Sequence, residues 1–267
     1  MSSTTTAAGA ATDAANALLT IDNLGKRFGG FVALDGISLV VKAGERLGLI
    51  GPNGSGKSTL VNCICGTLQN EVGSVTFNGH RLNGMSAHQR TRRGLSRTFQ
   101  LPRPFASLSL ADNMRVPLLY TVASRGAALD KVAAHGAALD AGDIAARCIE
   151  LLREVGLENK AHRLPRELTQ VEMRKLELAR AMAAEPALLI ADESMAGLSQ
   201  VEVADIVALL IALNERGVTI ILIEHIMRAV MRFSQRLVVL VSGAKIADGA
   251  PAEVIRDPAV ERAYLGQ

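Results

Sequence analysis

The chain has 267 residues, of which 49% are hydrophobic and 21% are charged, and its formal net charge is +3. These values are typical of a globular protein with one large domain, or a core domain with a subdomain, and a sizeable core. No apolar run is long enough to span a membrane. A mild net charge and an aromatic content of only 3% argue against a nucleic-acid-binding surface.

The first segment differs from the rest of the chain. Residues 1–17 are rich in Ser, Thr and Ala and lack the basic start and apolar centre of a signal peptide. We therefore predict a disordered tail there. Short β-like runs follow, at residues 18–21, 36–41, 46–50, 73–79 and 95–99.

The middle of the chain has a helical texture. Residues 108–168 are Ala-rich with few β-branched residues, a composition that favours helices. Within this stretch, the pattern Gly-Ala-Ala-Leu-Asp at 126–130 recurs at 136–140. The repeat is too short for a solenoid unit, so we interpret it as a low-complexity helical insertion.

Strands return in the last third of the chain. Apolar runs at residues 187–191, 218–223 and 237–241 alternate with helical segments at 201–213 and 226–233. Alternating β and α units with apolar strands predict a parallel sheet that is buried on both faces. The predicted fold is therefore an α/β core with a helical block inserted in mid-sequence.

The most informative stretch, residues 51–59, follows an apolar run and precedes a segment that can continue as a helix. Strand, Gly-rich loop, Lys-Ser and helix form the context of a phosphate-binding P-loop. The glycines let backbone N–H groups approach a polyphosphate, and the helix N-terminus adds the positive end of its dipole. We expect Lys57 to reach the β- and γ-phosphates of ATP and the Ser58 hydroxyl to hold Mg²⁺. The residues predicted to bind the nucleotide here are Gly51, Pro52, Asn53, Gly54, Ser55, Gly56, Lys57, Ser58 and Thr59.

Polar residues at three strand ends complete the predicted site. Asp192 and Glu193 stand at the end of one apolar run. Asp192 would help to hold Mg²⁺, and Glu193 would polarise the attacking water. His225 lies just beyond another strand, at the edge of the sheet where ligands collect. Gln100 directly follows the strand-like run at residues 95–99. Its amide oxygen can coordinate the metal or position water.

Two other groups of residues carry no predicted chemistry. Cys63, Cys65 and Cys148 have no zinc-like spacing with His, and we interpret them as small core residues in a reducing cytoplasm. The densest basic stretch contains a single aromatic residue, so we interpret it as a solvated face rather than a nucleic-acid site. Its members are Arg90, Arg92, Arg93, Arg97 and Arg103.

The P-loop, Gln100, the Asp192–Glu193 pair and His225 occur in the order found in ATP-binding cassette (ABC) proteins. From residue 18 to its end the chain resembles that family. The resemblance implies an ABC nucleotide-binding domain over residues 18–267, with a P-loop NTPase core and an antiparallel β subdomain on the N-terminal side. The helical subdomain would span about residues 101–185.

The resemblance also assigns roles to single residues. Phe28 occupies the place of the aromatic residue that stacks on adenine in this family, and stacking needs only a flat π face. His225 would contact the γ-phosphate. A GTPase is disfavoured, because no Asn-Lys-x-Asp motif for reading guanine is present.

Several segments sharpen the match to one branch. They resemble the ATPase subunits of branched-chain amino acid importers and lie at residues 97–100, 102–105, 196–198, 223–227 and 257–266. The resemblance implies transmembrane permease subunits as partners, met through residues 99–114, and a periplasmic binding protein as an indirect partner. It also implies a peripheral location at the cytoplasmic face of the inner or plasma membrane.

The signature sequence departs from the family pattern. ABC proteins carry a motif near LSGGQ that grips the γ-phosphate bound to the opposite subunit, and residues 168–172 read Leu-Thr-Gln-Val-Glu. Thr169 keeps the hydroxyl and can cap a helix. Val171 replaces a glycine that allows close backbone approach, and Glu172 brings a negative charge toward phosphate. The loop after Glu193 is also altered, at Ser194 and Ser199.

Because such ATPases work as head-to-tail dimers, a weak signature damages the partner's site. We therefore favour a heterodimer, in which this chain's own site meets an intact signature. A slow homodimer, and a variant signature that works through Thr169 and the helix dipole, stay open.

The leading prediction for function is the ATP-hydrolysing subunit of an importer for branched-chain amino acids or related small polar solutes, with ATP and Mg²⁺ as cofactors. The alternatives are a soluble ABC ATPase of DNA repair or cofactor assembly and a non-hydrolysing ATP-dependent regulator. The signature change favours the regulator, whereas the intact Glu193 opposes it.

Overall fold

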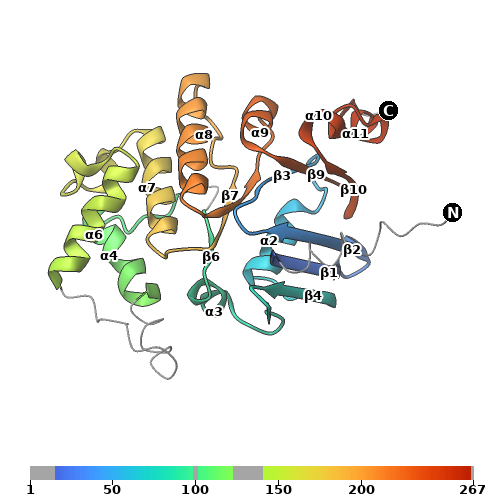
Figure 1. The fold of residues 1–267 in the computed structure, drawn as a ribbon, viewed down its shortest axis with the longest axis horizontal. Helices are drawn as coiled ribbons and strands as arrows, with labels where there is room; N and C mark the ends of the chain where they lie inside the picture. Colours follow the sequence, from blue (N-terminus) through green and yellow to red (C-terminus); the bar gives the residue numbers. More distant parts are fainter. Residues whose placement is uncertain (1–15, 99–101, 123–140, 266–267) are drawn as a thin grey trace.

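The computed structural model describes residues 16–98, 102–122 and 141–265. Most of the predicted tail and the repeat at 126–140 lie outside this part, and Ala17 is already the first residue of a strand. Two sheets lie side by side, and a block of helices lies at the end of the molecule away from the antiparallel sheet (Figure 1).

The first sheet is antiparallel, with the strand order β2-β1-β4-β5. Its strands are β1 (Ala17–Phe28), β2 (Phe31–Lys42), β4 (Val72–Phe77) and β5 (His80–Arg81). Two glycines join β1 to β2, so the pair forms a long hairpin that has Phe28 and Phe31 at its tip. Buried side chains such as Leu19 and Phe77 belong to a core shared with the second sheet. The predicted antiparallel β subdomain is confirmed.

The second sheet has the order β10-β9-β3-β8-β7-β6. Its strands are β3 (Arg46–Ile50), β6 (Leu95–Arg97), β7 (Leu188–Asp192), β8 (Thr219–Ile223), β9 (Arg236–Val241) and β10 (Ala244–Gly249). Every neighbouring pair is parallel except β9 and β10. The central strands are apolar and buried, as a sheet covered on both faces requires, so the predicted parallel sheet is confirmed.

The sequence patterns did not predict β10. A two-residue turn of Ser242 and Gly243 joins it to β9, and both residues have positive φ angles, 48° and 80°. Such turns match the twist of a hairpin but are signalled mainly by Asn-Gly or Asp-Gly. The turn lies against the P-loop, because the Gly243 N–H donates to the Ser55 carbonyl at 3.0 Å.

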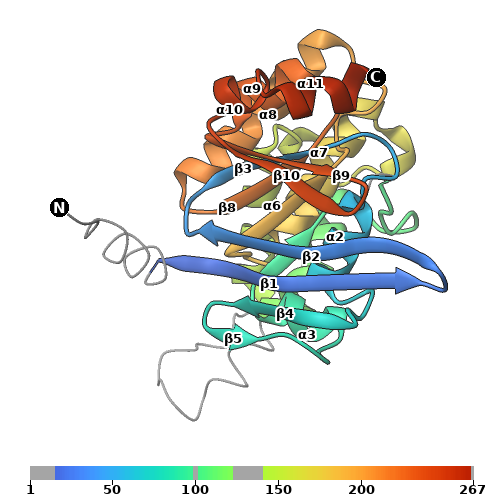
Figure 2. The ribbon, with the colours of Figure 1, turned by 90° about the vertical axis from the view of Figure 1, so that its right-hand side faces the viewer.

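Helices cover both faces of the second sheet. On one face, between the two sheets, lies α2 (Lys57–Cys65), whose buried residues share a core with both (Figure 2). The other face is covered by α7 (Gln170–Met182), α8 (Gln200–Glu215) and α9 (Met227–Phe233). Near the C-terminus, α10 (Pro251–Val254) and α11 (Pro258–Leu265) pack on β9 and β10.

A helical subdomain is inserted between β6 and β7, as the sequence predicts. Besides α7, this subdomain contains α4 (Leu110–Pro117), η1 (Leu118–Val122), α6 (Ala141–Glu154), η2 (Glu158–Lys160) and η3 (Pro165–Glu167). Met114, Leu152 and Leu176 are fully buried and bring α4, α6 and α7 together. The same apolar core continues to the sheet through Leu189 and Leu222, so the subdomain packs as part of the main body.

Arg90 corrects the interpretation of the basic stretch as a solvated face. It lies on α3 (Ala87–Arg92) and is only 1% exposed. Its guanidinium donates to the carbonyls of Cys63 and Ile64, at 2.7 and 2.8 Å, and so caps the C-terminal end of α2. It also donates to the carbonyls of Leu82 and Met85. The negative end of the helix dipole stabilises a buried cation there, although burial lowers the pKa of the Arg90 guanidinium.

The three cysteines are buried free thiols, as predicted for core residues. Burial raises the pKa of the Cys65 thiol to about 12. A thiol of that pKa stays protonated at neutral pH, so it packs as an apolar group.

Arg236 ties the edge of the second sheet to the antiparallel sheet. From β9 it donates to both carboxylate oxygens of Asp248 on β10, at 2.6 and 3.0 Å. It also donates to Glu45 at 3.0 Å and to the Val40 carbonyl of β2 at 2.9 Å. Burial by itself raises the pKa of Asp248, but the hydrogen bonds from Arg236 and Lys245 outweigh it and hold the pKa below its usual value.

This arrangement predicts a pH-dependent contribution to stability. Because the folded-state pKa of Asp248 is depressed, the stabilisation is complete above the ordinary aspartate pKa of about 3.9 and is lost as the pH falls through the folded-state value. Asp248→Asn should lower the free energy of unfolding by about 2 kcal/mol at pH 7. Urea titrations should show this difference narrowing as the pH falls below about 4. A difference that stays constant over that range would contradict the assignment.

Candidate nucleotide-binding site

A pocket of about 230 Å³ lies between the P-loop and the hairpin tip of β1 and β2. It brings together residues from three parts of the sequence: the hairpin, the P-loop with the start of α2, and the end of β7. The lining residues are Phe28, Phe31, Ala33, Asn53, Gly54, Ser55, Gly56, Lys57, Ser58, Thr59 and Glu193.

The loop at residues 51–56 connects β3 to α2 and needs glycine at defined places. Gly56 is the N-cap of α2 with φ 102°, and a Cβ there would lie 2.7 Å from the Ala33 carbonyl oxygen. A Cβ at Gly51 would overlap the Leu240 carbonyl oxygen of β9. The backbone is therefore packed tightly from behind at these two positions, where only glycine fits.

The Lys57 side chain folds back onto the start of the P-loop. Its ammonium donates to the carbonyls of Gly51 and Pro52 at 2.7 and 3.0 Å. Burial lowers the pKa of Lys57, and the negative charges of Glu193 and Asp192 oppose this shift. A partly desolvated ammonium beside a Gly-rich loop is suited to bind phosphate oxygens.

The two acids at the end of β7 have different surroundings. Asp192 is buried, and its Oδ2 accepts a hydrogen bond from Arg97 at 2.6 Å. Glu193 lines the pocket, has a φ of 45° that is uncommon outside glycine, and donates its N–H to the Ile223 carbonyl at 2.9 Å. Strained backbone conformations of this kind are common at functional sites. The surrounding structure maintains them and so fixes the direction of the side chain.

Aromatic side chains form the outer wall of the pocket. Phe28 is 49% exposed, and the Lys26 ammonium lies 5.3 Å from its ring centre. Phe31, across the hairpin turn, is 62% exposed and lines the same pocket. Exposed rings of this size are suited to stack on a planar base. Phe31 was not predicted, because only the hairpin register brings it to the tip.

Six predicted residues are not among the pocket-lining set, namely Gly51, Pro52, Asp192, His225, Thr169 and Gln100. Gly51 and Pro52 belong to the loop behind the pocket, and Asp192 is buried beside Arg97. His225 follows β8 and is exposed, while the buried carboxylate of its neighbour Glu224 accepts the Met195 N–H at 2.9 Å. Thr169 is the N-cap of α7, in the helical subdomain. Gln100 lies outside the described residues.

The C-terminal helix also reaches the P-loop. Burial raises the pKa of the Tyr264 phenol on α11, and the nearby Gly51 backbone N–H opposes this shift. The sequence links residues 257–266 to the family only by resemblance. The contact joins residues 213 positions apart and leaves no local signal.

The variant signature is held in an internal network at the start of α7. The Glu172 carboxylate accepts hydrogen bonds from the Lys160 ammonium at 2.6 Å and the Thr169 N–H at 3.0 Å. In return, the Thr169 hydroxyl accepts from the Glu172 N–H at 3.4 Å, which completes a capping box. The hydrogen bond from Lys160 and then that from Thr169 lower the pKa of Glu172, so it stays ionised.

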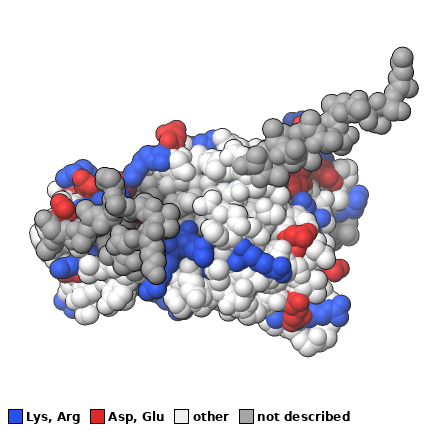
Figure 3. Space-filling view, turned by 60° about the horizontal axis from the view of Figure 1, so that its bottom comes forward, with Lys and Arg blue, Asp and Glu red and all other residues white. Residues whose placement is uncertain are grey.

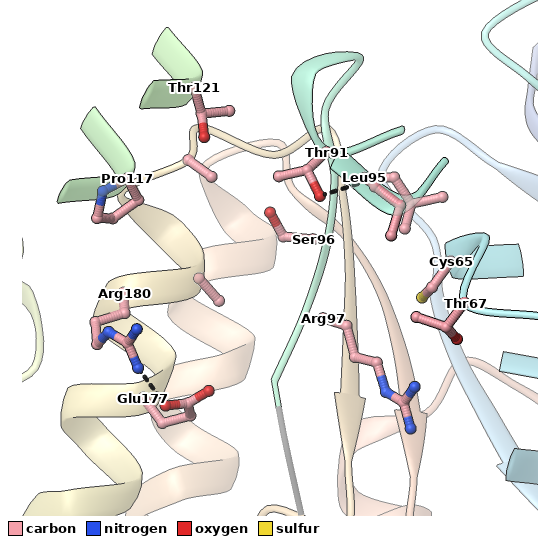
Figure 4. A pocket seen from close by; sticks show the side chains of 13 residues that line it. Cys65, Thr67, Thr91, Leu95, Ser96, Arg97, Pro117, Thr121, Glu177 and Arg180 are labelled. Atoms are coloured by element: carbon pink, nitrogen blue, oxygen red, sulfur yellow. Dashed lines mark hydrogen bonds and ion pairs between the residues drawn. The ribbon is translucent and has the colours of Figure 1, made fainter. Parts of the chain in front are cut away.

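A second, larger pocket of about 300 Å³ separates α3 and β6 from α7 and η1; we call it the groove (Figure 4). Its lining residues include Thr91, Ser96, Arg97, Thr121, Glu177 and Arg180. Ser96 Oγ, Arg97 Nε and Arg180 Nε are buried and have no hydrogen-bond partner among the described residues. Lys and Arg side chains gather near the middle of the face at the bottom of Figure 1, between the helical and β parts (Figure 3).

A Gly-rich loop between a parallel strand and a helix, with acids at the end of a neighbouring strand, defines a P-loop nucleoside triphosphatase. A family model described as "ABC transporter" matches residues 34–196, and one described as "Branched-chain amino acid ATP-binding cassette transporter" matches residues 244–267. The chain belongs to the ABC transporter family, as an ATP-binding and ATP-hydrolysing subunit.

Similar proteins cover almost the whole chain. The high-affinity branched-chain amino acid transport ATP-binding protein BraF of Pseudomonas aeruginosa is 37% identical over 94% of this chain and 98% of its own. LivG of Escherichia coli K12, described in the same words, is 35% identical over the same shares. The lipopolysaccharide export system ATP-binding protein LptB of Escherichia coli K12 is 30% identical, again over 94% and 98%.

Solved structures agree with the fold. A nucleotide-free ATP-binding cassette from an ABC transporter matches with a TM-score of 0.81 and 29% identity, over 94% of this chain and 100% of that one. A cassette in its ADP conformation matches with a TM-score of 0.80 and 29% identity, over 94% and 99%. ATPase subunits of ABC importers work with transmembrane permease subunits. In the described residues of this chain, no helix has the length and apolar character of a membrane span.

Proposed function

We propose that this chain powers the uptake of branched-chain amino acids or related small polar solutes, as the ATPase subunit of an ABC importer. The observation that carries the proposal is the branched-chain match over residues 244–267. Identity is also higher to BraF and LivG than to the exporter subunit LptB. The position of Glu193 in the pocket opposes a non-hydrolysing regulator.

The pocket supports the predicted roles of its residues. Backbone N–H groups within residues 53–59 would hold the ATP phosphates, Lys57 would offset their charge, and Phe28 and Phe31 would stack on adenine. Glu193 would act as the general base for the attacking water. His225 would contact the γ-phosphate from the end of β8, and Gln100 would help position metal and water.

The residues at the site fit Mg²⁺. Ser58 and Asp192 offer hard oxygen donors, and among the described residues no group of three or more His, Cys, Asp or Glu is placed to hold a metal. Mg²⁺ is usually bound by only one or two protein side chains, because water and phosphate oxygens supply its remaining ligands. When bound, Mg²⁺ would neutralise charge on the β- and γ-phosphates.

The groove is the proposed docking place for a cytoplasmic helix of a permease subunit. The predicted permease face at residues 99–114 leads into α4, which lies beside the groove, and Pro117 at the end of α4 lines it. The unpartnered donors of Arg97 and Arg180 suit a segment that offers carboxylate or carbonyl oxygens. Docking of this kind would keep the chain at the cytoplasmic face of the inner or plasma membrane, with a periplasmic binding protein as an indirect partner.

The signature geometry supports a heterodimer. Lys160 neutralises the charge of Glu172, which removes part of the repulsion expected toward phosphate. However, the Thr169 N–H and the Glu172 N–H, two of the donors at the start of α7, are already engaged inside the chain. A phosphate from a partner subunit would compete with these bonds, and Val171 restricts backbone adjustment. We therefore favour a partner ATPase subunit that carries an intact signature.

Uptake measurements test the transported solute. In a strain that lacks this gene, uptake of radiolabelled leucine, isoleucine and valine should fall, and the wild-type gene should restore it. The Lys57→Ala variant should leave uptake at the level of the deletion strain, because the ammonium that offsets phosphate charge is missing. Unchanged uptake of all three amino acids in the deletion strain would contradict the proposal.

A further inference from the structure

Arg97 connects three parts of the ATPase core. It is the last residue of the edge strand β6 and pairs in register with Ile190, two residues before Asp192 on β7. One arm of its guanidinium, Nη2, donates to Asp192 Oδ2 at 2.6 Å. The other, Nη1, donates to Asn62 Oδ1 at 2.7 Å, on the helix that begins at Lys57.

Both members of the ion pair are shielded from water. The side chains of Arg97 and Asp192 are 18% and 8% exposed. Charge-assisted hydrogen bonds in such surroundings are short and strong, whereas an isolated carboxylate would be costly there. The Asp192 backbone is fixed as well, because its N–H donates to the Thr98 hydroxyl at 3.2 Å.

We propose that Arg97 is a positioning residue for Asp192, which it orients for Mg²⁺ at the ATPase site. Arg97 holds one carboxylate oxygen of Asp192, so the other is presented in a fixed direction. Because Asn62 holds the same guanidinium, that direction is fixed relative to the helix that starts at the P-loop. Mg²⁺ demands nearly ideal octahedral geometry, so a carboxylate that can rotate binds it less well.

The nearby charges explain why loss of Arg97 would matter. Asp192 and Lys57 already interact electrostatically. Without Arg97, the charge of Lys57 would still attract the Asp192 carboxylate, which would draw the acid toward the phosphate-binding ammonium and away from the metal. Residues that orient a metal ligand typically contribute about 10–100-fold to metal affinity.

The test uses the purified full-length chain with Arg97→Met, which removes the charge and both hydrogen bonds but keeps an unbranched apolar stem. Binding of a fluorescent ATP analogue is measured against Mg²⁺ concentration and, separately, in EDTA. We expect the Mg²⁺ concentration for half-maximal binding to rise about tenfold, while the affinity in EDTA stays within about twofold. Arg97→Lys keeps one charged donor, so its Mg²⁺ concentration for half-maximal binding should lie between those of the wild type and Arg97→Met.

Two controls separate positioning from a general structural role. Arg216→Met removes an exposed ion pair to Glu154, away from the site, and should not change the Mg²⁺ dependence. In an Asp192→Asn background, Arg97→Met should add no further effect, because a double-mutant cycle isolates the pair. An unchanged Mg²⁺ dependence in Arg97→Met, or an equal loss of affinity in EDTA, would overturn the proposal.

Discussion

Replacing Glu193 with Gln is expected to lower kcat for ATP hydrolysis by about 10²–10⁴-fold, the usual contribution of a general base. ATP binding should stay close to wild type, because Gln keeps the size and reach of the side chain that lines the pocket. Phosphate release and binding of a fluorescent ATP analogue, measured on the same preparations, separate the two effects. Loss of binding together with turnover would contradict the assigned role.

The same assay addresses the partner subunit. If the heterodimer proposal holds, the chain by itself binds ATP but turns it over slowly, and activity rises when a partner with an intact signature is added. Clear turnover by the isolated chain, abolished by Glu193→Gln, would show instead that the Leu-Thr-Gln-Val-Glu signature at residues 168–172 works in a homodimer.

Replacing Arg90 with Met is expected to destabilise the fold strongly. The guanidinium donates to four carbonyl oxygens, of Cys63, Ile64, Leu82 and Met85. Met would fill most of the space but satisfy none of them, and buried unpaired acceptors are costly. The free energy of unfolding should fall by roughly 4 kcal/mol, as measured by urea denaturation.

Two comparisons sharpen this prediction. Arg92→Met, on the exposed side of the same helix, should change stability by less than about 0.5 kcal/mol. Arg90→Lys should be intermediate, because a single ammonium cannot reach all four carbonyls. Equal stability of the Arg90→Met and Arg92→Met variants would show that the cap on α2 contributes nothing.

Most of the nucleotide pocket could be predicted from the sequence. The P-loop has a fixed spacing in a strand–helix context, and Asp192 and Glu193 directly follow an apolar strand. Such local patterns leave little choice of structure. The parallel arrangement of the central strands could also be predicted, because alternating β and α units restrict the possible topologies.

The residues that local patterns could not reveal are those defined by distant partners. Among the described residues Arg90 pairs with no carboxylate, and in the sequence a buried arginine of this kind looks like a surface one. The Lys160–Glu172 pair, the hairpin position of Phe31 and the Arg97–Asp192 pair exist only after the chain has folded. The Ser242–Gly243 turn was missed because its composition is an uncommon one for a two-residue hairpin.

The contact between Tyr264 and the Gly51 N–H has a practical consequence. The terminal helix that carries the branched-chain match lies against the loop that receives ATP. A purification tag fused after Gln267 would therefore begin four positions after Tyr264, whose side chain lies near the P-loop backbone. Nucleotide affinities measured on such a fusion would report on the tag as well as on the enzyme, whereas a tag placed before Met1 avoids attachment at this end.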